Sequence, residues 1–336
     1  MKRRDLLIAS PALLAQAAPA RNIILFTSDG LRWQDVFHGI DPLLMGEKEA
    51  HMDQARRLRD MFWRESPDQR REALMPELWR MIAPHASLSS EVAVTNAFRV
   101  SYPGYSEIMT GRTQDEAIRG NSPKQNPVET FLEFLRRRWS LKREQVAVFG
   151  SWNAFQWMSE RTPGTIAINA GYAPIAGTPR LDELNRMQRQ LMTEDDEARH
   201  DWITVEMAAE YMRAFKPRVL YVALNETDEW AHHKRYDRYL EMAHYIDKCL
   251  ARFWALAQSI PEYRGSTALV ATADHGRGAT LDDWTSHGAQ VVGADRIWLA
   301  VAGANRPPVS GLAIRQRDIA PMILRMVGVD PAEYYS

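Results

Sequence analysis

The sequence has very little cysteine: Cys249 is the single one among 336 residues. An internal disulfide is therefore excluded, and a chain of this length can bury a sufficient core without one. The net charge is also close to zero, because 42 lysines and arginines balance 43 aspartates and glutamates. This balance gives no electrostatic case for binding nucleic acid or an anionic membrane. There is no internal repeat and no low-complexity tract.

Long hydrophobic runs are missing as well, since no stretch after the N-terminus approaches the roughly 18 apolar residues of a membrane span. The N-terminus combines basic Met1–Arg4 with an apolar run from Leu6 to Ala15 and an A-x-A pattern at Ala18-Pro19-Ala20. The Arg3-Arg4 pair resembles a twin-arginine signal, and an ordinary secretory signal fits the same pattern. We expect residues 1–20 to be a signal peptide and the protein to be exported, to the periplasm or outside the cell.

Apolar runs alternate with helical patterns over the rest of the chain. The runs predict buried strands at 22–26, 92–99, 146–149, 219–224, 268–271 and 296–302. Helices are predicted at 128–139, over most of 181–215, and at 236–257 and 318–327. This alternation indicates an α/β fold with a mostly parallel sheet. We expect one catalytic domain over 21–336, with insertions near 45–81, which is helical with a break at Pro67, and 151–200, which begins with a loop-rich stretch.

Acidic residues follow three of the predicted strands, namely Asp29, Asp228 and Asp274. Open α/β sheets bind their ligands at the carboxyl ends of the strands. Histidines lie close by: His275 follows Asp274, and the Asp-x3-His spacing puts His232 on the same side of a helical turn as Asp228. Taken alone, Asp-His-Gly at 274–276 could equally be a turn without a function.

Ser101 is the candidate nucleophile. Pro103 suits the first turn of a helix, where its missing N–H costs nothing, so we expect Ser101 just before a helix N-terminus. The free N–H groups and the helix dipole favour a nucleophile or a phosphate there. The structural alternative is that Ser101 only caps the helix.

Adding His287 gives three carboxylates, three imidazoles and one hydroxyl as candidate metal ligands. They are Asp29, Ser101, Asp228, His232, Asp274, His275 and His287. Mixed histidine and aspartate ligands suit zinc, with manganese as the alternative. Seven ligands are too many for one tetrahedral ion but fit two divalent ions that share a phosphate ester substrate. We expect His233 and His244 to be solvated or to pack between helices rather than to bind metal.

Four short motifs resemble the nucleotide pyrophosphatase/phosphodiesterase (type I phosphodiesterase) group of the alkaline phosphatase superfamily. Ser-Tyr-Pro-Gly-Tyr-Ser-Glu-Ile-Met-Thr-Gly at 101–111 is similar to that group's Thr-Phe-Pro-Asn-His-Tyr-Ser-Ile-Val-Thr-Gly. Asp228–His232 resembles its Asp-x-x-Gly-His, 273–276 its Ala-Asp-His-Gly, and 287–288 its final His-Gly. The resemblance spans nearly all of residues 21–336.

The resemblance implies a three-layer α/β/α sandwich around the sheet and a two-metal esterase. Asp228, His232 and His287 would hold one ion, and Asp29, Ser101, Asp274 and His275 the other. Asn121 would contact the transferring phosphoryl oxygen. The chain departs from the group in having serine as the nucleophile and Ala231 before the first histidine.

The substrate class follows from the charges around Ser101. Monoesterases need an arginine with bidentate reach to hold the extra phosphoryl charge. Arg99 and Arg112 flank the motif, but their direction is not fixed by the sequence. Tyr102 and Tyr105 could provide apolar surface for the second substituent of a diester, so we favour phosphodiesters.

Other functions remain open at this point. Ser-x-Pro-x at 101–104 also resembles sulfatases, which have an arginine where Tyr105 stands. A phosphomonoesterase or phosphonate hydrolase of the same superfamily would use the same ligands. A non-catalytic metal-binding envelope protein is the alternative from another class. The oligomeric state cannot be derived from the sequence.

Overall fold

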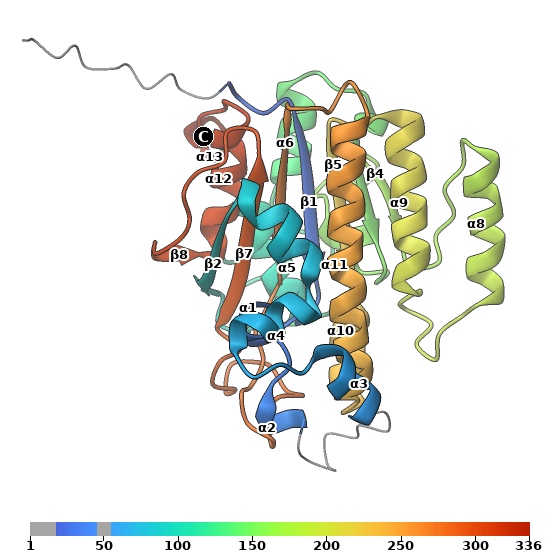
Figure 1. The fold of residues 1–336 in the computed structure, drawn as a ribbon. Helices are drawn as coiled ribbons and strands as arrows, with labels where there is room; N and C mark the ends of the chain where they lie inside the picture. Colours follow the sequence, from blue (N-terminus) through green and yellow to red (C-terminus); the bar gives the residue numbers. More distant parts are fainter. Residues whose placement is uncertain (1–17, 46–54) are drawn as a thin grey trace, which may run out of the picture.

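The computed structural model describes residues 18–45 and 55–336, in which eight strands form one sheet of order β4-β3-β5-β1-β6-β7-β2-β8 (Figure 1). The strands are β1 (Asn22–Ser28), β2 (Ala86–Ala93), β3 (Val146–Gly150), β4 (Ala167–Ala170), β5 (Val219–Leu224), β6 (Thr267–Thr272), β7 (Arg296–Gly303) and β8 (Ile314–Arg315). All neighbouring pairs are parallel except the two that β7 makes with β6 and β2. The predicted mostly parallel sheet is confirmed.

Helices cover both faces of the sheet and make the predicted three layers. They are α1 (Trp33–His38), α2 (Pro42–Met45), α3 (Ala55–Phe62), α4 (Pro67–Leu74), α5 (Ser101–Thr110), α6 (Phe131–Arg138), α7 (Phe155–Met158), α8 (Pro179–Gln190), α9 (Asp201–Phe215), α10 (Glu226–His232), α11 (Tyr236–Ser259), α12 (Ile319–Met326) and α13 (Pro331–Tyr335). One π-helical segment, η2 (Leu78–Ile82), and three 3₁₀ segments, η3 (Ala83–His85), η4 (Arg143–Gln145) and η5 (Gln316–Asp318), complete the described structure. Figure 1 shows α9 and α11 on the opposite side of the sheet from α12 and α13.

The central strands are apolar because both of their faces are covered. Every residue of β1, β5 and β6 is buried. Such strands consist of continuous aliphatic runs instead of alternating apolar and polar residues. This is why the sequence pattern located them to within a residue or two.

The strand predicted at 92–99 is wrong in its bounds, because β2 runs from Ala86 to Ala93. Beyond it, the backbone amides of Thr95 and Asn96 donate to the Glu107 carboxylate, and Arg99 has a φ of 52°. The chain therefore turns into α5 instead of continuing the sheet. The early half of β2 contains several serines and is only partly buried, so its sequence does not look like a strand.

The start of α5 is also corrected. Ser101 is the first helical residue and Val100 occupies the N-cap position without a side-chain cap. The alternative that Ser101 caps the helix is thus wrong. Pro103 becomes the third helical residue, where it is tolerated because the amides of the first turn lack intrahelical partners.

The insertions are partly described. In the 45–81 insertion, residues 46–54 lie outside the described residues, and the remainder forms α3, α4 and most of η2, with Pro67 opening α4 as expected. The loop-rich stretch from 151 contains α7 and the short edge strand β4, which the sequence analysis missed. Residues 1–17 of the expected signal peptide are likewise outside the described part. Within 18–45 and 55–336, no helix has the length and apolarity to cross a membrane.

Candidate active site

Three adjacent strands bring the acidic side chains to one edge of the sheet. Asp29 directly follows β1, Asp274 lies two residues beyond β6, and Asp228 sits in α10, which starts just after β5. Because β5, β1 and β6 are parallel neighbours, their carboxyl ends meet. The structure therefore brings together the three acids that the sequence analysis selected.

Asp29, Asp274 and His275 form a first, fully buried group, in which one ligand atom of each lies within 4.8 Å of the others. His275 Nε2 is 3.3 Å from Asp29 Oδ1 and 3.4 Å from Asp274 Oδ2. The second oxygens are engaged, since Tyr105 Oη donates to Asp29 Oδ2 and Gly30 N donates to Asp274 Oδ1. Asp29 Oδ1 and Asp274 Oδ2 are left buried without a hydrogen-bond donor. Such a pair of orphaned carboxylate oxygens fits a divalent cation.

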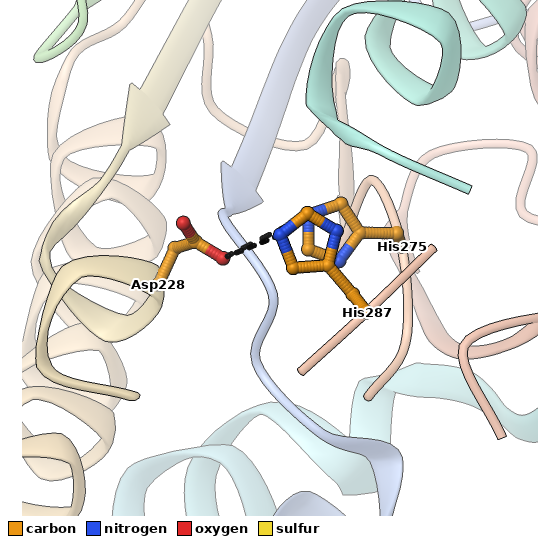
Figure 2. A group of neighbouring side chains, drawn as sticks. All are labelled: Asp228, His275 and His287. Atoms are coloured by element: carbon orange, nitrogen blue, oxygen red, sulfur yellow. Dashed lines mark ion pairs between the residues drawn. The ribbon is translucent and has the colours of Figure 1, made fainter. Parts of the chain in front are cut away.

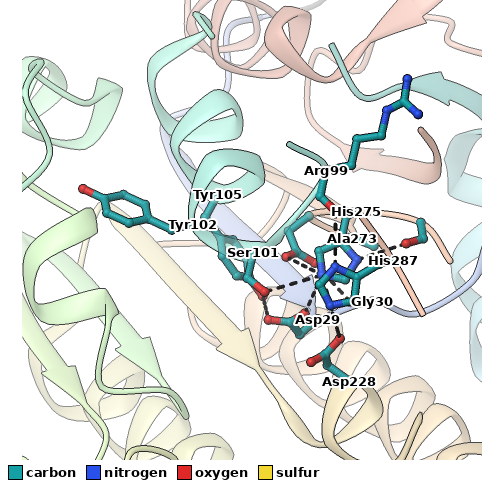
Figure 3. Close-up of polar contacts among 12 residues, drawn as sticks. Asp29, Gly30, Arg99, Ser101, Tyr102, Tyr105, Asp228, Ala273, His275 and His287 are labelled. Atoms are coloured by element: carbon teal, nitrogen blue, oxygen red, sulfur yellow. Dashed lines mark hydrogen bonds and ion pairs between the residues drawn. The ribbon is translucent and has the colours of Figure 1, made fainter. Parts of the chain in front are cut away.

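Ser101 lies against this group. Its Oγ is 3.4 Å from His275 Nε2, and the residue is buried (Figure 3). The close approach depends on Gly104, because a Cβ at that position would be 2.3 Å from the carbonyl oxygen of Asp274. The first turn of α5 is thereby packed onto the end of β6, with the hydroxyl beside the ligands.

Asp228, His232 and His287 form a second, more open group. His232 Nε2 is 3.1 Å from both Asp228 Oδ2 and His287 Nε2. His287 Nε2 is 3.8 Å from Asp228 Oδ1. The His287 ring is nearly parallel to that of His275, with centroids 3.9 Å apart (Figure 2). The two groups are therefore contiguous, and His275 Nε2 also lies 3.8 Å from Asp228 Oδ1.

Burial and neighbouring charges shift the pKa values of these groups. Burial and the nearby Asp29 charge raise the pKa of Asp274 to about 8. Burial lowers the pKa of His275, but the Asp274 and Asp29 carboxylates outweigh this and raise it to about 9. Burial and the charge of His275 lower the pKa of His287 strongly, and burial lowers that of His232. A bound cation would relieve the repulsion between the carboxylates and favour the neutral imidazoles.

The sequence of the chain matches a known family. A family model described as type I phosphodiesterase / nucleotide pyrophosphatase matches residues 50–320. The chain belongs to this family. The match confirms the resemblance noted from the motifs. Membership of this family makes the chain a hydrolase of the alkaline phosphatase superfamily.

Solved structures show the same fold at low sequence identity. An alkaline phosphatase superfamily protein from Vibrio parahaemolyticus has 15% identity and a TM-score of 0.55, with 96% of this chain and 71% of that chain covered. The lipoteichoic acid synthase LtaP of Listeria monocytogenes has 10% identity and a TM-score of 0.55, covering 93% and 73%. A protein described as a putative sulfatase from Bacteroides thetaiotaomicron has 11% identity and a TM-score of 0.57, with 92% of this chain and 71% of that chain covered. No curated protein matches the chain.

Asn121 lies next to the candidate nucleophile of this family member. Its Oδ1 accepts a hydrogen bond from the backbone amide of Tyr102, which follows Ser101. The side chain is exposed. Asn121 is 20 residues beyond Ser101 in the sequence, and the fold brings it next to the start of α5.

The two tyrosines expected to provide apolar surface for a substrate have different surroundings. Tyr105 is buried and faces Asp29, so its assignment to an apolar substrate surface is wrong. Tyr102 lines a cavity of about 280 Å³ together with residues 116–120, Ser122 and Lys124. Most of the lining residues flank Asn121 in the sequence, and Tyr102 directly follows Ser101.

Neither flanking arginine is directed at Ser101. Arg99 Nη1 donates to the carbonyl oxygen of Ala289, and its guanidinium points away from the ligands (Figure 3). Arg112, at the opposite end of α5, stacks on the Tyr335 ring at 4.7 Å. Both cations are therefore engaged away from the hydroxyl.

His233 and His244 were expected to be solvated or to pack between helices. His233 is exposed and lies 3.5 Å from Glu229. His244 packs on Phe62, and its Nδ1 lies 2.7 Å from the carbonyl oxygen of Leu74. Neither belongs to the Asp/His groups described above.

The sequence analysis missed Arg277, which pairs with Asp228 and is buried. It also missed the bond from Tyr105 to Asp29. The only sequence signal for Arg277 is its position just after the Asp-His-Gly turn. A charged residue there is more commonly exposed.

Proposed function

We propose that the protein hydrolyses phosphate esters, and preferentially diesters, through a phosphoseryl intermediate on Ser101. The observation that carries the proposal is the buried Ser101 hydroxyl, 3.4 Å from His275 Nε2, beside two orphaned carboxylate oxygens. A hydroxyl in the first turn of a helix is well placed to receive a phosphoryl group, because the positive end of the helix dipole favours negative charge there.

The ligand set would hold two divalent ions, with zinc favoured over manganese by its mixture of imidazoles and carboxylates. Asp228, His232 and His287 would hold one ion, and Asp29, Asp274, His275 and Ser101 the other. When bound, such ions supply Lewis acidity, which lowers the pKa of the serine hydroxyl and offsets phosphoryl charge.

The chain's own residues would then act in two steps. Ser101 Oγ loses its proton to solvent and attacks phosphorus, the bond to the leaving oxygen breaks, and the leaving group takes a proton from water. Water next attacks the phosphoserine, the P–Oγ bond breaks, and Ser101 regains a proton. Asn121, held by the Tyr102 amide, would donate its amide N–H to a non-bridging phosphoryl oxygen.

The preference for diesters rests on charge and space. Arg99 and Arg112 are both engaged away from Ser101, so neither holds the second negative charge of a monoester. The cavity beside Tyr102 offers room for a second substituent. A diester carries one less charge and needs that room.

A substrate panel tests the proposal. It comprises nitrophenyl phosphate, its methyl and nucleotidyl diesters, a nitrophenyl phosphonate monoester and nitrophenyl sulfate. We expect at least one diester to have the highest kcat/KM. A monoester hydrolysed at least about tenfold faster than every diester, or sulfate as the sole substrate, would overturn the preference. Failure of all substrates with added zinc or manganese would favour a non-catalytic metal-binding protein.

We also infer export and a single catalytic domain. The sequence pattern at 1–20 supports export, and the participation of all eight described strands in one sheet supports a single domain over 21–336. N-terminal sequencing of protein from the native host should find the mature chain starting at Arg21, in the periplasm or the medium. Full-length protein recovered from the cytoplasm alone would contradict export.

A further inference from the structure

The Arg277 side chain connects the segments that carry the candidate ligands, although the mechanism above does not use it. Its Nε donates to the carbonyl oxygen of Gly30 at 3.2 Å, and its Nη1 to that of Thr285 at 2.6 Å. Its Nη2 donates to the Asp228 carbonyl oxygen at 3.3 Å and to Asp228 Oδ1. Gly30 adjoins Asp29, and Thr285 is two residues before His287. One guanidinium therefore ties together the ends of β1, α10 and β6 and the loop of His287.

The surroundings are shaped for this guanidinium. Arg277 is 1% exposed, and an isolated buried charge is costly unless its donors are bonded and its charge is paired. Here all three nitrogens donate, and Asp228 pairs the charge. Gly30 has a φ of 55°, and a Cβ there would lie 2.7 Å from Arg277 Nε. The loop after β1 thus leaves room for the arginine.

We propose that Arg277 is a positioning residue for the ion that Asp228, His232 and His287 would hold. This inference rests on the proposed function. Arg277 bonds to Asp228 Oδ1, the oxygen that lies 3.8 Å from His287 Nε2, and leaves Oδ2, which is 3.1 Å from His232 Nε2, without a bond to the guanidinium and available to the ion. Arg277 thereby makes Asp228 a one-oxygen ligand and fixes the loops before an ion arrives.

A purely electrostatic role of Arg277 and a positioning role predict opposite changes in metal affinity when the arginine is removed. A cation beside a metal site repels the incoming ion, so its removal would tighten metal binding. Positioning predicts weaker binding on removal, because loss of a hydrogen-bonded partner of a ligand typically costs about 10- to 100-fold in metal affinity. The direction of the change in affinity therefore distinguishes the two roles without any activity assay.

The experiment titrates the full chain, stripped of metal, with zinc in competition with a chromophoric chelator. We expect two equivalents in the wild type and, in Arg277→Met, one equivalent weakened by about 10- to 100-fold with the other unchanged. Arg277→Lys should recover part of the loss, since an ammonium can still pair with Asp228 but cannot span Gly30 and Thr285.

Arg199→Met is the matched control. Arg199 is equally buried, and its guanidinium donates to Thr204, Gln188 and Asn169, none of which is a candidate ligand. We expect this variant to lose stability while it retains both equivalents. If Arg277→Met does not fold by circular dichroism, Arg277→Lys carries the test, with the same single equivalent weakened.

Three other results would overturn the positioning role. Unchanged or tighter binding of both equivalents in a folded Arg277 variant would overturn the positioning role while the proposed function stands. Equal weakening in Arg199→Met would also overturn it, because the effect would then be one of general stability. A wild type that binds no divalent ion would overturn the proposed function, and this inference with it.

Discussion

Ser101 combines two properties that its neighbours in the sequence do not share. It is the first residue of α5, and it is buried beside His275. Ser106, in the next turn of the same helix, is buried too, but its Oγ lies 3.4 Å from Asn126 Nδ2 and away from the ligands. The two serines therefore form a matched pair for mutagenesis.

We predict that Ser101→Ala lowers kcat for the best diester by about a thousandfold or more, because the covalent route is lost. Ser106→Ala should keep most of the activity. The measurement is steady-state kinetics on both variants, with zinc content determined in parallel. A Ser101→Ala enzyme within about tenfold of wild type would remove Ser101 as the nucleophile.

The raised pKa values of Asp274 and His275 predict how the metal-free protein responds to pH. Both groups bind a proton more tightly folded than unfolded, so their contribution to stability is lost as pH rises. The window for Asp274 extends from its ordinary value of 3.8 to about 8, and that for His275 from 6.5 to about 9. Metal-free protein should therefore lose stability between pH 6.5 and 9.

Thermal unfolding of chelator-treated protein across this range tests the sign. Bound zinc should remove the decline, because the ion replaces both protons and its apparent affinity rises with pH. Asp274→Asn, which cannot titrate at that position, should have a shallower decline than wild type. A metal-free midpoint that rises from pH 6.5 to 9 would contradict the assignment.

The site depends on how closely the helices α5 and α10 approach the ends of the strands. Asp201, at the start of α9, accepts hydrogen bonds from the amides of Asn225 and Glu226 and so anchors the start of α10. Gly104 allows α5 to approach the backbone at Asp274. These contacts contribute to the positions of the functional side chains on both helices.

We predict that Gly104→Ala destabilises the protein by about 1–3 kcal/mol, as overpacking does, and lowers kcat by displacing Ser101. The new Cβ would lie 2.3 Å from the backbone oxygen of Asp274, which cannot move without shifting β6. Gly120→Ala is the control for stability alone, because no atom lies within 4 Å of its Cβ position but the residue lines the cavity beside Tyr102. Unfolding midpoints of both variants and kcat of Gly104→Ala check this. Equal unfolding midpoints of the two variants would show that the approach of α5 to β6 does not limit stability.

Metal binding should be linked to the stability of the whole protein, because the ligands come from widely separated segments. A ligand that binds only the folded state stabilises it by about 2.7 kcal/mol at a hundredfold excess over Kd. We therefore predict that chelation lowers the midpoint of thermal unfolding by several degrees and that zinc restores it.

Elemental analysis of protein purified without chelators should accompany that measurement. We expect close to two equivalents of zinc or manganese. Calcium as the sole ion would instead point to sulfatase-like chemistry. A midpoint that is indifferent to chelator and to every added divalent ion would contradict a structural link between the metal and the fold.

Local sequence patterns were sufficient to identify the central strands of the sheet, the family and the side chains that gather at the ends of these strands. Buried strands are continuous apolar runs, and residues that end parallel neighbours must meet, so Asp29, Asp228 and Asp274 could be placed from local pattern alone. The short motifs around Ser101 and His275 are equally local.

The distant groups that bond to these residues could be identified from the folded structure alone. The turn that ends β2 is held by Glu107, Tyr105 faces Asp29 instead of a substrate, and Arg277 is buried between loops. The physical reason is that burial of a polar side chain depends on partners contributed by other segments, and periodicity along the chain carries no information about them.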